Sequence, residues 1–308
     1  MSSDLTPDAV AAAAARIHDL VRHTPLWEVE LRGRRLLLKA EHMQRSGSFK
    51  FRGASHATLR AQGRGATTVV TASGGNHGLA VAVAAAALGM QADVFVPAAI
   101  PPDKLGRIRL AGARVVEVDG DYQDAADAAA DHAERNALPY VSAFDQPDVI
   151  AGQGTAITEV LAERPDCDAV VVAVGGGGLL AGAALASAGR VAVFGAEPEG
   201  IPTVTQALAA GEPVDVTIDS VTASALGARR TSAVNLGVLR EWPVTMGLVS
   251  DSALLRARDE LWEEHRIAVE PAAGAALALA LDGPPLGVLP CVVLCGANSG
   301  WTSSPPAP

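Results

Sequence analysis

Short apolar runs alternate with helix-like segments along most of the chain, and this pattern restricts the possible folds more than any other feature. Strands are predicted at 67–72, 92–96, 114–118, 140–144, 169–174, 191–196, 244–249 and 288–295. Helices are predicted at 79–88, 102–111, 122–136, 153–163, 179–188, 252–265 (with Asp251 as N-cap) and 272–281. Continuous Val, Ala and Leu runs between helices are typical of parallel sheets that helices cover on both faces. The chain is therefore predicted to be an α/β protein built on parallel sheets.

The predicted strands fall into two sets that are separated near residues 145–150. This separation indicates two α/β units, and no internal repeat relates them. In such folds ligands bind at the carboxyl ends of the strands, in the loops that lead into helices. Those loops are therefore the first place to look for function.

Composition excludes several classes of function. The chain is 49% hydrophobic and 19% charged, and its net charge of -10 argues against binding to nucleic acid or anionic lipid. Its apolar runs are shorter than the roughly 20 residues of a membrane span, and no basic segment precedes an apolar one as in a signal peptide. Three cysteines without framework spacing indicate a reducing compartment and no disulfides. We expect a cytoplasmic protein without nucleic-acid or membrane partners.

A run of four glycines leads directly from the strand at 169–174 into a helix. Its members are Gly175, Gly176, Gly177 and Gly178. Residues without a Cβ let the backbone approach a ligand closely, and a helix start offers free N–H groups and positive potential. The run predicts an anion site, most naturally for phosphate, although a tight turn would also contain one or two glycines.

A dinucleotide site is an alternative for the same segment. Gly176, Gly178 and Ala181 match the GxGxxA spacing, and Glu197 follows Gly176 by 21 residues, where an acid that binds ribose belongs. The match is short, and Pro198 follows the acid directly. On this segment alone, NAD binding stays open.

A second loop, SGGNHG at 73–78, also joins a predicted strand to a predicted helix. Small residues, exposed amides, Asn76 and His77 at a helix start favour binding of a carboxylate. His77 could equally begin a helix without a chemical function, whereas a Gly-Gly-Asn turn presents the Asn76 side chain. A third loop, at 295–300, begins with Cys295, which either faces the crevice or is a small buried apolar residue.

Lys50 stands between Phe49 and Phe51 and is one of only three lysines, against 21 arginines. An amine becomes a nucleophile or base when an apolar surround or a nearby cation lowers its pKa. The two rings could supply part of that surround. An amine nucleophile, a phosphate site and a carboxylate site together predict a lysine bound covalently to pyridoxal phosphate. NAD chemistry has no need for such a lysine.

Nine segments occur in one order along nearly the whole chain. They are HTPL (23–26), LLLKAE (36–41), SGSFKFRGA (46–54), TASGGNHG (71–78), IAGQGT (150–155), VGGGGLLAG (174–182), GAEP (195–198), VEPAAGAA (269–276) and LCGAN (294–298). In these segments the chain resembles the fold type II (tryptophan synthase β-like) pyridoxal-phosphate enzymes. Within them it is similar to the L-threonine/L-serine dehydratases and serine racemases.

The resemblance implies roles for individual residues. Lys50 would be the catalytic residue and would hold pyridoxal 5'-phosphate, with Phe49 against the ring, Asn76 at the ring 3-oxygen and Cys295 at the ring nitrogen. The phosphate would be bound by Gly175, Gly176, Gly177, Gly178 and Leu179. The substrate carboxylate would lie among Ser73, Gly74, Asn76 and His77.

The same resemblance implies a reaction and an organisation. A β-hydroxy L-amino acid such as L-threonine or L-serine would lose water and then ammonia to give a 2-oxo acid. A small domain at 68–144 would be inserted into a large domain at 1–67 and 145–308, in a homodimer. The family's isoleucine-inhibited members carry a further C-terminal domain, so we expect no inhibition by isoleucine. The final SSPPAP is expected to be disordered.

Three departures from the family leave alternatives open. Thr203 stands where the family's divalent-metal site has an Asp six residues after Glu197, so no metal is expected. Gly74 takes the place of a second Ser in the racemases. The segment ALGARR (225–230) is unusually basic. Dehydration of phenylserine or hydroxyaspartate, racemisation and β-replacement therefore remain alternatives to the threonine or serine reaction.

Overall fold

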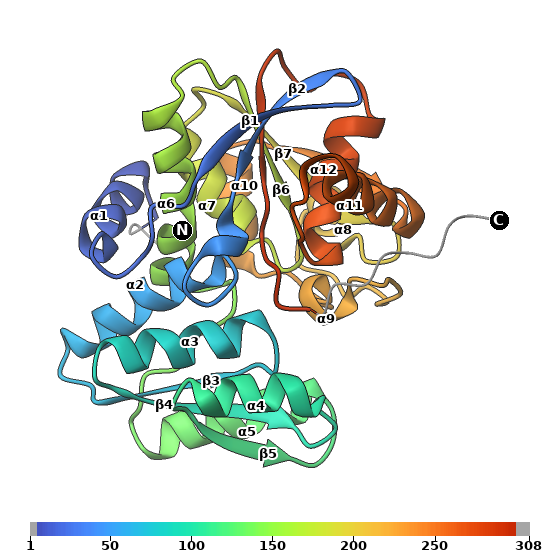
Figure 1. The fold of residues 1–308 in the computed structure, drawn as a ribbon. Coiled ribbons are helices and arrows are strands. Elements are labelled where there is room, and N and C mark those ends of the chain that lie inside the picture. The colour runs from blue at the N-terminus through green and yellow to red at the C-terminus, as the bar shows by residue number, and fades with distance from the viewer. Residues whose placement is uncertain (1–4, 300–308) are drawn as a thin grey trace.

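The computed structural model describes residues 5–299, and its strands form two separate sheets (Figure 1). The larger sheet has the strand order β1-β2-β9-β6-β7-β8, and the smaller has the order β3-β4-β5. The strands are β1 (Leu26–Leu31), β2 (Arg34–Lys39), β3 (Thr68–Ala72), β4 (Gln91–Pro97), β5 (Arg114–Val118), β6 (Ala169–Ala173), β7 (Ala192–Pro198), β8 (Thr245–Val249) and β9 (Pro290–Val293). Within the described residues every pairing between these nine strands is parallel except that of β1 with β2. The predicted α/β fold with parallel sheets is confirmed.

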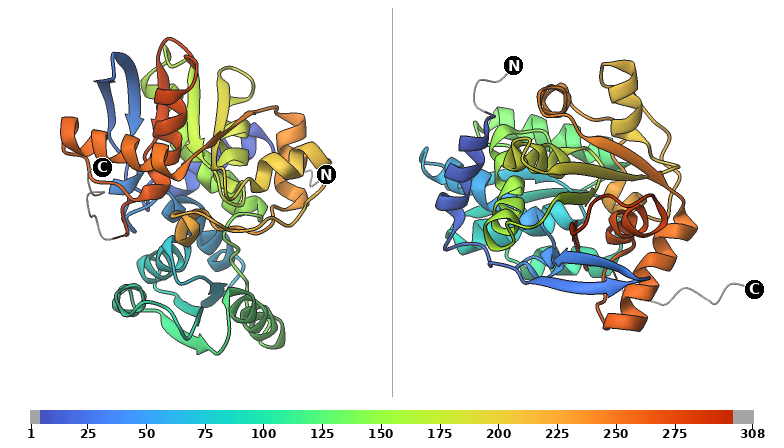
Figure 2. Two further views of the ribbon diagram at one scale, coloured as in Figure 1. Left: turned by 90° about the vertical axis from the view of Figure 1, so that its right-hand side faces the viewer. Right: turned by 90° about the horizontal axis from the view of Figure 1, so that it is seen from above.

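Helices cover both faces of each sheet (Figures 1 and 2). The larger sheet has α1 (Pro7–Ile17), α6 (Pro147–Glu163), α7 (Gly178–Ser187) and α10 (Ala233–Glu241) on one face and α11 (Asp251–His265) and α12 (Pro271–Asp282) on the other. The smaller sheet has α2 (Lys50–Gln62), α3 (Asn76–Ala87) and α4 (Pro102–Leu110) on one face and α5 (Tyr122–Arg135) on the other. Shorter elements are α8 (Thr203–Ala210), α9 (Ala223–Leu226) and a 3-10 turn at Glu41–Met43. None of the described helices is long and apolar enough to cross a membrane.

The sequence of β6 shows why the larger sheet needs two helical layers. Val170 and Val172 belong to the core shared with α6 and α7, while Val171 and Ala173 belong to the core shared with α12. Successive side chains of a strand point to opposite faces. A strand that is apolar at every position therefore has to be buried on both sides, at a gain of about 25 cal/mol for each Å² of apolar surface removed from water.

One predicted strand, 140–144, is wrong. Its only pairing within the described residues is a single bridge between Tyr140 and Val70. The Gln146 side chain donates to the Tyr140 carbonyl at 2.8 Å and accepts from the Ser142 amide at 3.0 Å. These bonds fold the backbone into a turn and remove groups that a neighbouring strand would need.

Two predicted helix starts also differ. The N-cap of α11 is Ser250, whose hydroxyl accepts from the Ala253 amide at 3.2 Å, whereas Asp251 accepts from the Val221 amide at 2.8 Å. The helix predicted at 153–163 already begins at Pro147, a residue that suits a first helical turn. The domain limits 1–67 with 145–308 and 68–144 stay a prediction, and the SSPPAP tail lies outside the described residues.

Two glycines let α2 and α6 approach closely where α2 carries Lys50. A Cβ on Gly152 would lie 2.7 Å from the Cα of Gly53 and 2.9 Å from the Arg52 carbonyl. A Cβ on Gly53 would lie 2.6 Å from the Gln153 side chain and 2.7 Å from a backbone carbonyl of α6. Because backbone atoms occupy this space, a larger residue at either position would push the two helices apart.

We therefore expect Gly152→Ala to lower the free energy of unfolding by about 1–3 kcal/mol, the usual range for overpacking a core. Gly237, in the middle of α10, is the matched control because a Cβ there meets no atom within 4 Å. Gly237→Ala should stabilise by about 0.5–1 kcal/mol. Denaturant unfolding of both variants measures this, and equal effects of the two substitutions would contradict the close crossing.

Candidate active site

Backbone hydrogen bonds place Lys50 beside the end of β9. The Phe49 amide donates to the Cys295 carbonyl at 3.0 Å, and the Ala297 amide donates to the Gly47 carbonyl at 3.0 Å. The segment before α2 therefore runs along the loop after β9, although the two are far apart in the sequence. This pairing explains why Lys50 and Cys295, predicted from separate motifs, lie close enough to interact electrostatically.

Lys50 has the surround that lowers an amine pKa. Its Nζ donates to the Ala143 carbonyl at 2.8 Å and lies 5.1 Å from the centre of the Phe49 ring. Burial lowers the Lys50 pKa to about 8, against the opposing effect of the Asp145 charge. Phe51 does not contribute, because its side chain is fully buried in the core between α2 and the smaller sheet.

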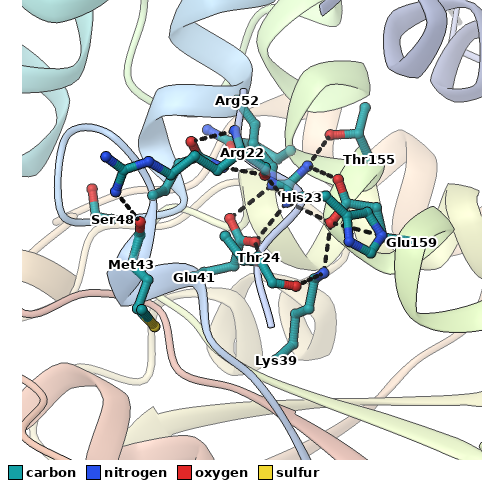
Figure 3. Close-up of polar contacts among 12 residues, drawn as sticks. Arg22, His23, Thr24, Lys39, Glu41, Met43, Ser48, Arg52, Thr155 and Glu159 are labelled. Atoms are coloured by element: carbon teal, nitrogen blue, oxygen red, sulfur yellow. Dashed lines mark hydrogen bonds and ion pairs between the residues drawn. The ribbon is translucent and has the colours of Figure 1, made fainter. Parts of the chain in front are cut away.

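A buried cluster of charges anchors the first turn of α2 (Figure 3). The Arg52 guanidinium donates to both oxygens of Glu41 at 2.7 Å. It also donates to both oxygens of Glu159, at 2.7 and 2.8 Å, and Lys39 donates to Glu159 at 2.5 Å. Burial favours the neutral form of Arg52, but the two carboxylates raise its pKa above the usual value. Two cations thus meet two carboxylates, the pairing that buried charges require.

The glycine run opens α7 with free amides. Gly177 is the N-cap, has a φ of 96° and provides no capping side chain. The Gly176 carbonyl accepts from Thr231 Oγ1 and Asn235 Nδ2, both at 2.8 Å. Because the C=O and N–H of a trans peptide point in opposite directions, these bonds turn the Gly177 N–H away from Thr231 and Asn235. First-turn amides without a cap bind anions such as phosphate. Thr231 and Asn235 were missed in the sequence, where neither belongs to a motif.

Phe144 links the glycine run to Lys50. A Cβ at position 176 would lie 2.5 Å from the Phe144 ring, and a Cβ at 178 would lie 2.5 Å from the Phe144 carbonyl. Ala143, the preceding residue, accepts the hydrogen bond of Lys50. Glycine is therefore required at both positions, and the run packs directly against the segment that Lys50 contacts.

The loop at 73–78 places its polar side chains unequally. Ser73 Oγ accepts from the Gly75 amide at 3.1 Å and closes the turn before α3. His77 is buried, and its Nε2 donates to the Val141 carbonyl at 3.0 Å. Burial lowers the pKa of His77 to about 3, so its ring is neutral and carries no charge toward a carboxylate. The backbone amides of α3, which also begins without a capping side chain, remain the groups available to a carboxylate.

A small cavity of about 30 Å³ lies beside this loop. Its lining includes Gly74, Gly75, Asn76, Lys104, Arg107, Ser224, Ala225, Glu270 and Asn298. Gly74 and Asn76 are predicted site residues, whereas Glu270 and Asn298 were not assigned. Glu270 and Asn298 lie in VEPAAGAA and LCGAN, two of the segments that carry the family resemblance. That position could have identified them as site residues.

Cys295 is a neutral thiol. It is 3% exposed, and all three cysteines are free. Burial raises the pKa of the thiol well above its usual value, and the negative charge of Glu270 raises it further. The thiol can therefore donate or accept a hydrogen bond but carries no charge toward a ligand.

Of the segment ALGARR, Ala225 lines the cavity but the two arginines do not. Both arginines are exposed, and Arg230 pairs with Asp215 at 2.9 Å. Glu197 caps α8, because its oxygens accept from the Val204 amide at 2.6 Å and the Thr205 amide at 2.9 Å. In the described part of the chain, no group of three or more His, Cys, Asp or Glu side chains could hold a metal.

Comparisons with known proteins agree with this geometry. The model of the family "Pyridoxal-phosphate dependent enzyme" matches residues 17–288. The chain is 34% identical to an L-threonine ammonia-lyase of Geobacter sulfurreducens over 89% of this chain and 70% of that protein. It is 33% identical to a serine racemase of Oryza sativa subsp. indica over 89% of this chain and 83% of that protein. The crystal structure of a T.th. threonine deaminase superposes with a TM-score of 0.90 and 34% identity, over 96% of this chain and 99% of that one.

The lowered pKa of Lys50 predicts how its reactivity depends on pH. Only the uncharged amine is a nucleophile, so the rate of Lys50 acylation should rise with pH and level off above the pKa of about 8. An ordinary lysine would level off only above about 10.4. Mass spectrometry of the cofactor-free protein gives the rate, with a synthetic peptide of residues 45–54 as the control. A protein profile that coincides with the peptide profile would contradict the burial of this amine.

Proposed function

Because this chain belongs to the family of pyridoxal-phosphate-dependent enzymes, we propose that it removes water and then ammonia from a β-hydroxy L-amino acid such as L-threonine or L-serine. The product is a 2-oxo acid: one water leaves in the elimination and one is consumed when ammonia is released. The observation that carries the proposal is the position of Lys50, whose amine of lowered pKa adjoins the glycine run. Relatives named threonine ammonia-lyase and threonine deaminase support it.

The residues of the site fit the cofactor. Lys50 would hold it covalently, with Phe49 beside the ring, because Nζ already lies 5.1 Å from the Phe49 ring. The uncapped start of α7, from Gly175 to Leu179, would bind its phosphate. Asn76 and Cys295 would contact polar atoms of its ring. When bound, pyridoxal phosphate withdraws electrons from the substrate and makes its α-proton acidic.

Lys50 and Cys295 would have different roles in the reaction. The uncharged Nζ of Lys50 is the base for the α-proton, and a pKa near the working pH suits that task. The Cys295 thiol is neutral and cannot place a charge at the ring nitrogen as an aspartate would. With a neutral group at that position, bound pyridoxal phosphate would withdraw electrons less strongly, which would favour prompt loss of the hydroxyl.

The substrate would be oriented by the start of α3. Ser73, Gly74, Asn76 and His77 would surround its carboxylate, His77 through its backbone because its ring is bound to Val141. We further propose the division into a large domain (1–67 and 145–308) and a small domain (68–144). This division is supported by the separate core of the three-stranded sheet. A cytoplasmic homodimer is proposed from the resemblance alone.

Racemisation, the activity in the names of other relatives, needs a proton donor on the face of the substrate opposite Lys50. Position 74 would provide it, and glycine has no proton to give. A Cβ there would lie 2.6 Å from Ile100 Cδ1, so the end of an apolar side chain occupies space that a serine side chain would need. This pairing of Gly74 with Ile100 favours elimination over racemisation.

The first test of the function is Lys50→Ala. We expect loss of the visible absorption of the bound cofactor and of essentially all 2-oxo acid formation from L-threonine and L-serine. Borohydride reduction of the unmodified protein should attach the cofactor to Lys50, as peptide mass spectrometry detects. Reduction without an adduct at Lys50 would refute the proposal, and an assay across β-hydroxy amino acids would identify the preferred substrate.

The second test is the substitution of Gly74 by Ser together with Ile100 by Val, which removes the Cδ1 atom that obstructs a side chain at 74. A positioned acid typically contributes about 10²–10⁴-fold in rate, so the double variant should form D-serine at a higher ratio to 2-oxo acid than the parent. Ile100→Val alone is the control. Chiral chromatography of reactions in deuterated water gives the ratio, and substantial deuterated D-serine from the unmodified protein would contradict the role of Gly74.

A further inference from the structure

Glu270 is a buried carboxylate that no step of the proposed reaction uses. It is 5% exposed and lies at the N-cap of α12, with its backbone amide bound to the Gly296 carbonyl at 3.0 Å. Its Oε1 accepts from Asn76 Nδ2 at 2.8 Å, and its Oε2 accepts from the Asn298 amide at 3.3 Å. Each carboxylate oxygen of Glu270 therefore accepts a hydrogen bond from an N–H group.

Asn298 completes a closed set of hydrogen bonds around Asn76. Its Nδ2 donates to Asn76 Oδ1 at 2.8 Å and to the Ser46 carbonyl at 2.8 Å. The Asn76 amide therefore has its oxygen bound by Asn298 and one of its two N–H groups bound by Glu270. The second N–H of Asn76 has no partner among these residues. Its direction is fixed, because a flipped amide would place its oxygen against the Glu270 oxygen and its NH₂ against the Asn298 NH₂.

Two glycines make room for these partners. A Cβ on Gly296 would lie 2.6 Å from Glu270 Oε1. A Cβ on Gly47, whose φ is +73°, would overlap Asn298 Oδ1. The backbone on both sides of the Phe49–Cys295 junction is therefore shaped to hold Glu270 and Asn298 beside Asn76.

We propose that Glu270 and Asn298 are positioning residues that fix the Asn76 amide so that its free N–H points at the cofactor ring. The inference rests on the proposed cofactor site, in which Asn76 contacts the ring 3-oxygen. Burial raises the Glu270 pKa, while the Asn76 hydrogen bond and the charge of Lys104 lower it. Glutamine at 270 would be isosteric, yet its NH₂ would face either the Asn76 or the Asn298 donor and break one of the two hydrogen bonds that hold this network.

The test measures cofactor affinity and the visible absorption band of the loaded protein in Glu270→Gln, Asn298→Ala, Asn76→Ala and the Glu270→Gln/Asn76→Ala double variant. A hydrogen bond to a charged partner is worth about 10- to 100-fold in affinity. We expect Glu270→Gln to weaken cofactor binding by about that factor and to shift the band. In the Asn76→Ala background, Glu270→Gln should change affinity by no more than about 2-fold, because the residue it positions is gone.

Asp93→Asn is the matched control. Asp93 is a buried carboxylate of β4 that accepts from Arg114 Nε at 2.8 Å, in the smaller sheet and away from the cavity. Asp93→Asn should lower the thermal midpoint of unfolding without shifting the visible absorption band. Asn298→Ala keeps the test informative if Glu270→Gln does not fold, since it should shift the band in the same direction.

The outcomes separate this inference from the proposed function. Parent-like affinity and band in both Glu270→Gln and Asn298→Ala would overturn the positioning role. An effect of Glu270→Gln that is equally large with and without Asn76 would also overturn it. A parent protein that forms no covalent link at Lys50 would instead refute the proposed function, on which this inference depends.

Discussion

The site depends on the hydrogen bond from the Phe49 amide to the Cys295 carbonyl, which joins the start of α2 to the end of β9. This bond brings the lysine of one segment to the thiol of the other. The glycines next to it, Gly47 and Gly296, leave space for Asn298 and Glu270. Those two residues reach across to Asn76 at the start of α3. A single backbone junction in the larger unit thus also determines where the smaller sheet presents its loop.

Burial has opposite consequences for two groups of ionisable residues. In the site, burial favours the neutral forms of Lys50, His77 and Cys295, since each has at most a partial counter-charge. Beneath the site, Arg52 stays charged because Glu41 and Glu159 contact its guanidinium on both sides. The paired cluster holds α2 in place, and the unpaired amine at its first turn retains the reactivity that covalent chemistry requires.

Relatives with different names share this fold, so the fold alone does not select the reaction. Threonine deaminase superposes with a TM-score of 0.90 and maize serine racemase with a TM-score of 0.89. The groups proposed to favour elimination over racemisation are small and local: the absence of a hydroxyl at Gly74 and the Ile100 side chain next to it. Function therefore depends on loops placed by a common scaffold.

The sequence by itself determined the fold class and singled out the glycine run, Lys50 and Asn76 as candidates, because each rests on local chemistry: apolar periodicity, residues without a Cβ, and a rare amine. It wrongly predicted a strand at 140–144, because Gln146 binds that backbone only once the chain is folded. It also missed Thr231, Asn235, Glu270 and Asn298, and misjudged Phe51. Their importance comes from partners that are distant in sequence: Asn235 lies 59 residues from the carbonyl it binds, and Asn298 lies 222 residues from Asn76. Motifs report which groups can react, whereas the orientation and charge of those groups arise from burial and contacts that exist only in the tertiary structure.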